Sequence, residues 1–502
     1  MKKTTKAIVF VVCVLLVFAA MTSCNAKDEK SGDGKGDPAA NQENENANRA
    51  RSADDGLLRD NLPDGLDFGG YEFRVLFHTY GDRSGAYFYP EAEEGEILSD
   101  AFYKRNKKIQ ERFNVAIKAT KQEGGGNLSA AVIGKDVLAG ADEYDMYMVV
   151  DREAQNDASK GYLYPVNQLE YVDLAQLYWL RDVNEILTVG SKLPWAFSEE
   201  MLSVFENTLA VFYNKKQAQD LGFEDLYRIV REGGWTFDKF FEYAKAGIKN
   251  LGGNDKMTAD DCWGIVAGND EFYANFWIGA GINSVDKDAN GMPYFALPGN
   301  ERFLTMAQLI FDNKSIDGMY WDSHTRKLPL GTGIAAGIDF FRNGHAVFVV
   351  ATIQEMVNLR DMEDDFGVIP FPKFEKEQPR YYSRISGGRP FVIPTTNQRP
   401  DIAGALMEAM ACETSNTVYP AYYESSLKNK FSRDPETVEM LDLVRATLMY
   451  DLGDTIWFSD VRGPLTNDFN GKTNKIASWI EKNSDKVDKA IAKIVESIME
   501  AY

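Results

Sequence analysis

The feature that most constrains the fold is a regular alternation of strand-like and helix-like segments. Residues 71–77 and 115–117 are rich in aromatic and β-branched side chains, as is typical of strands, and the apolar run 144–150 makes a third. Between them, residues 100–113 and 132–139 carry apolar side chains at helical spacing. Strands that alternate with helices predict βαβ units, a mainly parallel sheet, and ligand sites at the carboxyl ends of the strands.

The same alternation continues through the rest of the chain. With 502 residues and 44% hydrophobic content, the protein has room for two or three domains and a large core. Further strands are expected at 209–213, 346–351, 366–369 and 391–394. Further helices are expected at 237–249 (with Thr236 as N-cap), 303–313, 402–412, 435–449 and 475–501.

The N-terminus has the pattern of an export signal. Three lysines precede the apolar run 7–21, and Ser23 precedes Cys24. The run has about 15 residues, short of the roughly 20 that span a bilayer as a helix. The sequence Met21-Thr22-Ser23-Cys24 resembles the bacterial lipobox, which implies a signal peptide over 1–23 and an acylated Cys24. Plain secretion and an uncleaved anchor are the alternatives.

The segment after Cys24 is unsuited to folding. Residues 25–56 contain no Val, Ile, Leu, Met or aromatic residue, so they bury too little apolar surface to pack. We expect residues 24–65 to be the acylated cysteine and a flexible tether, which holds the body outside the cytoplasmic membrane.

Charge and cysteine content exclude some partners. The formal charge is −21, and removal of residues 1–23 with their three lysines brings it near −24. Such acidity argues against nucleic acid and against electrostatic adsorption on anionic lipid, so membrane contact is expected through the lipid anchor only. Cys13 leaves with the signal, and Cys262 and Cys412 are expected as buried free thiols rather than a disulfide.

Several phrases resemble one family, and they occur in that family's order from about residue 70 onward. They are YLYPV at 162–166, ENTLAVFYNK at 206–215, GWTFD at 234–238, FRNGHAV at 341–347, FGVIPFP at 366–372 and SGG at 386–388. Together they resemble the extracellular solute-binding proteins of bacterial ABC importers, in the maltose-binding-protein-like, carbohydrate-binding group.

The resemblance implies a two-lobed α/β fold of the periplasmic-binding-protein-like type II, with the ligand cleft between lobes joined by hinge crossovers. Lobe 1 would hold residues 66–165 plus 388–440, and lobe 2 residues 166–387 plus 441–502. Hinge residues absorb large backbone changes, and the expected hinge positions are Pro165, Gly387 and Gly388. The adjacent glycines are also explained by a simple turn.

The resemblance also suggests which side chains bind the ligand. Sugars stack on aromatic rings and are hydrogen-bonded by planar polar side chains. The candidates are Tyr273, Glu271 and Trp277 in the segment 269–277, Trp457, Asn207, Gln354, Asp151 and Arg152 after the third strand, and Tyr80 and Tyr89 after the first. Each has a structural alternative: core packing for the rings, and a turn, helix surface or solvated loop for the polar residues.

Other signatures are weak. Residues 286–291 match the first half of a calcium loop, but Leu297 stands where a bidentate glutamate belongs, and a turn at Asn290-Gly291 explains the same residues. There is no G-x-S-x-G or H-E-x-x-H motif, and histidine occurs only at 78, 324 and 345. We therefore expect no enzyme activity, no cofactor and no metal.

By resemblance, the chain is expected to be a monomeric, extracytoplasmic receptor. It would bind a small-molecule carbohydrate, an oligosaccharide, and deliver it to ABC permease subunits. The alternatives are an extracellular glycan-active enzyme and a surface lipoprotein with an adhesive or structural role.

Overall fold

A computed structural model describes residues 56–78, 88–122, 126–253, 255–323, 331, 333–426 and 435–502. The chain divides into two units, Met1–Leu57 and Leu58–Tyr502, and the helices and strands named below belong to the second. Among the described residues, no helix combines the length and the apolar character needed to cross a membrane.

The first sheet has the strand order β12-β3-β1-β2. Strand β1 (Tyr71–His78) pairs in parallel with β2 (Val115–Gln122) and β3 (Met146–Met148), while β12 (Phe391–Val392) runs antiparallel to β3. The helices that alternate with these strands are α4 (Ile97–Phe113), α5 (Gly126–Ala139) and α6 (Asp151–Ala158). The βαβ pattern predicted from the N-terminal half is therefore confirmed.

The second sheet has the order β10-β4-β9-β5-β8. Its strands are β4 (Leu209–Asn214), β5 (Trp263–Ala267), β8 (Tyr320–Asp322), β9 (Ala346–Thr352) and β10 (Phe366–Ile369). β5 is parallel to β8 and β9, but β4 is antiparallel to both β9 and β10, so this sheet is mixed rather than mainly parallel as predicted. β4 and β9 are buried along their whole lengths because helices cover both faces.

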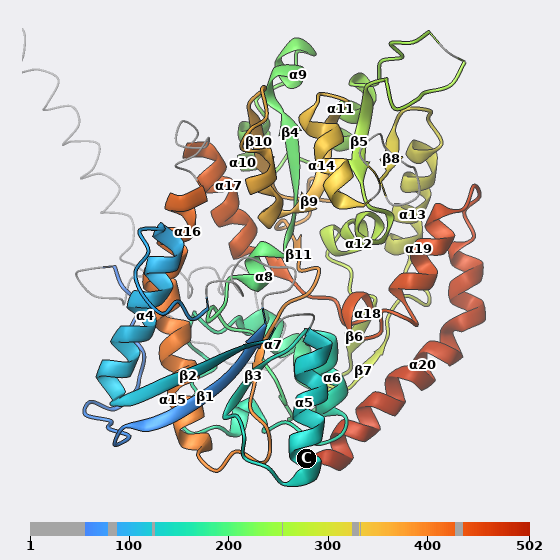
Figure 1. The fold of residues 1–502 in the computed structure, drawn as a ribbon. Helices are drawn as coiled ribbons and strands as arrows, with labels where there is room; N and C mark the ends of the chain where they lie inside the picture. The colour runs from blue at the N-terminus through green and yellow to red at the C-terminus, as the bar shows by residue number, and fades with distance from the viewer. Residues whose placement is uncertain are drawn as a thin grey trace, which may run out of the picture. The chain divides into compact units, whose positions relative to one another are not determined.

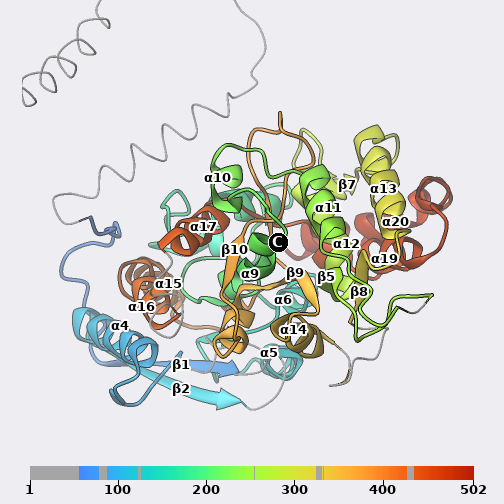
Figure 2. The same cartoon turned by 90° about the horizontal axis from the view of Figure 1, so that it is seen from above.

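Helices pack on both faces of the second sheet. Figure 2 shows α11 (Phe237–Ala246) and α14 (Ile334–Arg342) on opposite sides of it. The predicted cap of α11 is confirmed, since the Thr236 hydroxyl accepts from the backbone N–H of Lys239 at 3.4 Å. Further helices are α9 (Lys215–Asp220), α10 (Leu226–Arg231), α12 (Asn269–Gly279), α13 (Glu301–Lys314), α17 (Pro435–Ala446), α19 (Arg462–Asn470) and α20 (Ile476–Ala501).

The remaining helices and strands complete the fold. They are η1 (Val166–Gln168), α7 (Arg181–Leu187), α8 (Ser203–Glu206), β6 (Val285–Lys287), β7 (Pro293–Phe295), η2 (Ile353–Leu359), β11 (Ser383–Arg384), α15 (Pro400–Glu413), η3 (Thr414–Val418), α16 (Tyr419–Ser426), β13 (Leu448–Met449) and α18 (Leu452–Thr455). β6 and β7 form a hairpin, in which the Asp288 carboxylate accepts from the N–H groups of Asn290 and Met292 at 2.8 and 2.9 Å. The turn interpretation of residues 286–291 is confirmed.

Three chain segments lie side by side between the two sheets, and we call them the crossover segments: 207–208, 383–388 and 448–450. β11 pairs with β13, and Thr208 forms a bridge to Ile385. Figure 1 shows β11 between the first sheet, in the lower part of the view, and the second sheet above it. The crossover segments therefore connect the two lobes.

The packing differs from the predicted domain division at three places. The first is the tether, which was expected to run to residue 65. The backbone N–H of Leu58 donates to Asn416 at 2.9 Å, Arg112 pairs with Asp60 at 2.5 Å, and Leu62 is buried. Residues 58–65 thus belong to the folded unit, because their side chains have partners in it.

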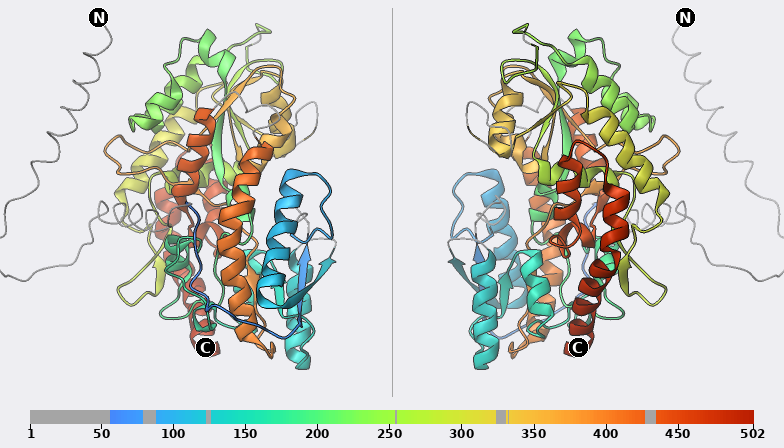
Figure 3. Two further views of the ribbon diagram at one scale, coloured as in Figure 1. Left: turned by 90° about the vertical axis from the view of Figure 1, so that its left-hand side faces the viewer. Right: turned by 90° about the vertical axis from the view of Figure 1, so that its right-hand side faces the viewer.

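The second place is the stretch that follows residue 165, which was assigned to lobe 2. Tyr178 and Trp179 donate to the carboxylate of Glu408 in α15 at 2.5 and 2.7 Å. α15 in turn packs beside α4 of the first sheet (Figure 3). The part of this stretch that contains Tyr178 and Trp179 therefore packs with the first lobe.

The third place is α17, whose first residues were assigned to lobe 1. This helix packs on β10 of the second sheet, and the Thr437 hydroxyl bonds to the Tyr227 hydroxyl at 2.8 Å. α17 therefore belongs with the second lobe.

Candidate functional site

A cavity of about 410 Å³ lies between α6 and the segment that leads from α18 into α19. Its lining residues are Val150, Arg152, Glu153, Gln155, Asn156, Ile456, Phe458, Ser459 and Ile494. The volume falls within the range of small-molecule sites. One wall comes from the carboxyl end of β3 in the first sheet, where an α/β fold places its ligand sites.

The α6 wall supplies polar groups. Arg152 is exposed and lines the cavity. The side chain of Gln155 is 8% exposed, and its Nε2 lacks a hydrogen-bond partner in the described part of the chain. Asn156 Nδ2 donates to Glu153 Oε2 at 3.3 Å. The wall thus offers N–H donors and a carboxylate acceptor to a polar solute.

The opposite wall is largely apolar and carries one aromatic ring. Phe458 is half-buried, and the Arg152 and Arg462 guanidinium carbons lie 5.2 and 4.4 Å from its ring centroid. Ile456 and Ile494 add aliphatic surface. A half-buried ring beside amide and carboxylate groups can offer apolar surface to the C–H groups of a solute whose hydroxyls meet the other wall.

The three aromatic residues predicted to stack on the ligand lie in the core instead. Tyr273 is 1% exposed and stacks on Phe469 with centroids 5.1 Å apart. Trp277 donates to Asp451 Oδ2 at 2.8 Å, and Trp457 donates to the carbonyl oxygen of Ala490 at 3.3 Å. None of the three lines the cavity, because α12 and the segment between α18 and α19 turn them into the core.

The predicted polar residues divide into two groups. Arg152 lines the cavity. Asn207 and Gln354 bond to each other, with Gln354 Nε2 donating to Asn207 Oδ1 at 3.1 Å, and they lie at the crossover rather than in the cavity wall. The Tyr89 hydroxyl is 3.5 Å from Gln110 Oε1, and its ring packs against the core.

Two predicted positions lie outside the described residues, namely Tyr80 and Cys24. Glu271 falls within α12, but its side chain is not part of the described structure. These three stay predictions.

Asp151 also differs from the expectation of a ligand contact. Its carboxylate is 2% exposed and accepts from the backbone N–H of Gly388 at 3.2 Å and from the Tyr450 hydroxyl at 2.9 Å. Burial raises the pKa of Asp151 even though these hydrogen bonds oppose the rise.

At the end of β1, burial and the nearby Arg389 guanidinium lower the pKa of His78 to about 4, so its imidazole is neutral at pH 7.

The predicted hinge positions have different surroundings. Gly387 has φ of +151°, which favours glycine, and Gly388 approaches Phe197 so closely that a Cβ would lie 2.3 Å from its ring. Both lie on the crossover segment 383–388. Pro165 does not lie at a crossover, because its neighbour Tyr164 donates to Ile393 within the first lobe at 2.7 Å.

The cavity contains residues that the sequence reasoning missed, namely Glu153, Gln155, Asn156, Ile456, Phe458, Ser459 and Ile494. Helix geometry could have found two of them, since Gln155 and Asn156 follow Arg152 by three and four residues and share its face. Phe458 adjoins the predicted Trp457, and only the packing distinguishes which of the two rings reaches the cavity.

The two thiols in the described part of the chain are free, as predicted. Cys412 is buried, whereas Cys262 is only half-buried.

The two sheets, the crossover segments and the cavity between α6 and α19 define the two-lobed α/β fold of periplasmic binding proteins. A sequence model of the family described as "Bacterial extracellular solute-binding protein" matches residues 82–414, and the chain belongs to this family. No curated protein matches the chain.

Solved structures with the same fold include three proteins in complex with small solutes. The galacto-N-biose-/lacto-N-biose I-binding protein of Bifidobacterium longum, with lacto-N-biose, is 13% identical with a TM-score of 0.55, covering 86% of this chain and 98% of that one. Lmo0181 of Listeria monocytogenes, with cycloalternan, is 12% identical with a TM-score of 0.53 (84% and 99% covered). UgpB of Mycobacterium tuberculosis, with glycerophosphocholine, is 14% identical with a TM-score of 0.50 (86% and 98% covered). At these identities the likeness shows the fold alone.

Proposed function

We propose that this chain is the receptor of an ABC importer and that it binds a short saccharide in the cavity between α6 and Phe458. The observation that carries the proposal is the composition of the two walls. One wall presents a guanidinium, two amides and a carboxylate, and the other presents an aromatic ring and two isoleucines. This is the combination that a sugar requires, with C–H faces on a ring and hydroxyls on planar polar groups.

The cavity volume supports a short solute. A volume of about 410 Å³ lies near the lower end of the range of about 300–1,000 Å³ that small-molecule sites span. One or two sugar rings fit this space better than the longer oligosaccharide expected from the sequence. The complexes of structural neighbours with lacto-N-biose and cycloalternan support a saccharide, whereas the glycerophosphocholine complex of UgpB makes a zwitterionic phosphodiester the competing class.

Solute capture would act through the crossover segments. A solute that contacts both walls favours the closed arrangement by its differential affinity for that state. The permease would then recognise the closed receptor, and Cys24, acylated, would keep the receptor at the outer face of the cytoplasmic membrane. No catalytic step is part of this proposal.

The test is calorimetry and thermal shift with the purified protein against monosaccharides, disaccharides, oligosaccharides, sugar phosphates and glycerophosphodiesters. We expect a disaccharide-sized neutral sugar to bind. Binding by the phosphorylated solutes alone would show that the solute class is wrong. Release of a cleaved product would favour the glycan-active enzyme instead.

Variants locate the site. Phe458→Ala should weaken binding about tenfold or more, since loss of a stacking ring costs roughly 0.5–1.5 kcal/mol beyond its buried area. Tyr294→Ala is the matched control, because this ring is 45% exposed on β7 and does not line the cavity. Arg152→Ala should weaken binding similarly, with the exposed Arg360→Ala as its control. Equal affinity of Phe458→Ala and the wild type would place the site elsewhere.

A further inference from the structure

Two buried carboxylates connect the walls of the cavity to the crossover segments. The first is Asp151, the first residue of α6. Its backbone N–H donates to the carbonyl oxygen of Gly388 at 3.1 Å, and its Oδ2 accepts from the Gly388 N–H at 3.2 Å. The same oxygen accepts from the Tyr450 hydroxyl at 2.9 Å. One side chain therefore contacts both the 383–388 and the 448–450 segments.

This contact depends on a close approach of the backbone. A Cβ on residue 388 would lie 2.3 and 2.7 Å from ring carbons of Phe197, so only glycine lets the segment come this near. The residue after Asp151 is Arg152, whose N–H donates to Asp151 Oδ1 at 2.8 Å and whose side chain lines the cavity. The α6 wall is thus held to the crossover at its first residue.

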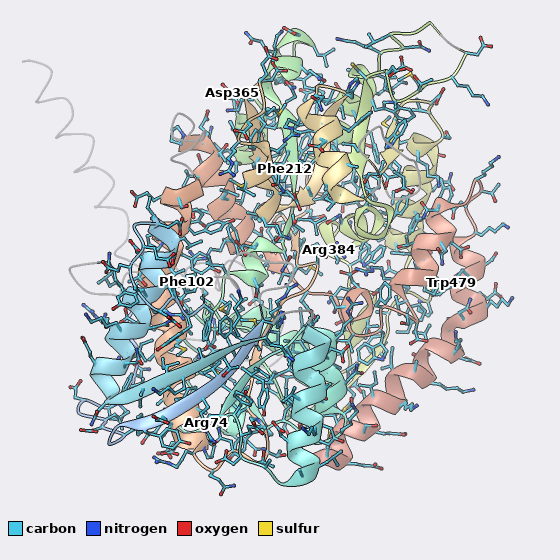
Figure 4. The ribbon with its side chains drawn as sticks, in the orientation of Figure 1. Arg74, Phe102, Phe212, Asp365, Arg384 and Trp479 are labelled. Atoms are coloured by element: carbon cyan, nitrogen blue, oxygen red, sulfur yellow. The ribbon has the colours of Figure 1, made fainter. Side chains whose placement is uncertain are left out.

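The second carboxylate is Asp454 in α18, which is fully buried. It accepts from Arg384 of β11 through Nε at 2.7 Å and through Nη2 at 3.0 Å, and Arg384 is itself 1% exposed. It also accepts from Arg462 at 3.2 Å. Arg462 lies against the Phe458 ring. Figure 4 labels Arg384 in the region between the two sheets.

We propose that Asp151 and Asp454 are positioning residues that couple opening of the crossover segments to the two walls of the cavity. Asp151 positions the α6 wall, and Asp454 positions the Phe458 wall through Arg462. Neither carboxylate contacts the solute in this scheme. This role rests on the proposed function, because it explains how closure of the lobes moves the walls of the cavity. The first test of it needs no solute.

The first test is hydrogen exchange of the full chain without any added solute. Asp151→Asn removes the charge that accepts from Gly388 and Tyr450, and hydrogen bonds to charged groups are the stronger ones. Exchange in peptides covering 385–390 and 448–451 should become about tenfold faster or more, while peptides of β5 stay unchanged. Unchanged exchange at the crossover peptides would overturn the proposal.

The matched control is Asp157→Asn. Asp157 lies on the same helix and is equally buried, at 2% exposed. Its carboxylate faces Lys160 at 3.7 Å rather than a crossover segment. This variant should leave exchange at 385–390 unchanged. Equal acceleration in both variants would mean that α6 is merely destabilised, and it would refute a specific role for Asp151.

A milder variant covers the case in which Asp151→Asn fails to fold. Tyr450→Phe removes only the hydroxyl donor and leaves the Gly388 contact intact. Exchange at 448–451 should rise a few-fold, while peptides of β5 stay unchanged. Unchanged exchange at 448–451 would overturn the proposal.

Asp454→Asn tests the second wall. Exchange at 383–388 should rise about tenfold, since the Arg384 guanidinium loses its charged partner. Any saccharide found to bind should bind the Asp454→Asn variant more weakly. In that variant, Phe458→Ala should reduce the affinity by less than it does in the wild type. Failure of every saccharide to bind would count against the proposed function alone, because the exchange readout is independent of solute.

Discussion

Replacement of Gly404 by alanine tests the packing that separates the observed domain division from the predicted one. Gly404 lies inside α15, where it faces the carbonyl group of Glu170. A Cβ at this position would lie 2.1 Å from that carbonyl oxygen and 3.2 Å from the Cβ of Leu169. The oxygen belongs to the backbone, so α15 and the 169–170 segment would have to move apart.

The expected magnitude follows from three contributions. Alanine gains about 1 kcal/mol over glycine in a helix interior. Overpacking of this kind costs about 1–3 kcal/mol. Separation would also strain the hydrogen bonds of Glu408, one helical turn further on, which accepts from Tyr178 and Trp179; bonds to charged groups are worth about 1.5–3 kcal/mol. We expect the free energy of unfolding to fall by about 2–4 kcal/mol.

Urea unfolding measures this change as a lower midpoint with an unchanged slope. Gly134→Ala is the control, because Gly134 lies inside α5 and its Cβ would meet only the Tyr162 ring at 3.4 Å. That variant should be as stable as the wild type or more stable by up to about 1 kcal/mol. If Gly404→Ala is also as stable as the wild type, residues 169–179 do not pack on α15 as described.

Three further predictions concern pH, the aromatic core and the anchor. Burial raises the pKa of Glu200 from its ordinary 4.5 to about 8. The folded state therefore keeps this proton at a pH at which the unfolded state has lost it. The contribution of Glu200 to the free energy of unfolding is full below pH 4.5 and is lost as the pH rises towards 8. Relative to Glu200→Gln, the wild type should lose roughly 3–5 kcal/mol of unfolding free energy over that range, at about 1.4 kcal/mol per pH unit, and parallel pH profiles would contradict this. Tyr273→Ala should lower the free energy of unfolding by about 3–5 kcal/mol without weakening solute binding by the folded protein. If calorimetry instead shows weaker solute binding at unchanged stability, Tyr273 contacts the ligand. Cys24→Ser should leave export and solute affinity intact but shift the protein from the membrane to the soluble fraction, and continued membrane retention would refute anchoring at this residue.

Much of the secondary structure could be predicted from local pattern. The strand at 71–77 and the helix capped by Thr236 appear where their side chains favour them. A helix depends on side chains three or four residues apart, and a strand depends on side chains that alternate between its two faces. Both patterns can be recognised from the sequence alone. The antiparallel β4 was not predictable in this way, because its pairing with β9 joins residues more than 100 positions apart.

The site was less predictable. Arg152 was found because it follows a strand at the edge where ligands collect in this fold, and it lines the cavity. Its neighbour Asp151 has the same position in the pattern but turns to Gly388 and Tyr450. Trp457 and Phe458 are adjacent aromatic residues, yet Trp457 is buried at 3% exposure and Phe458 lines the cavity.

Local sequence thus determined the class of fold, the positions of most helices and strands, and the acidic character of the chain. Tertiary structure alone decided which lobe residues 169–179 and α17 join, and which side chains face the cavity. The reason is physical: a periodic pattern shows that one face of an element is buried, but not which partner buries it. Only packing of distant segments resolves whether a polar or aromatic side chain contacts solute, a crossover segment or the core.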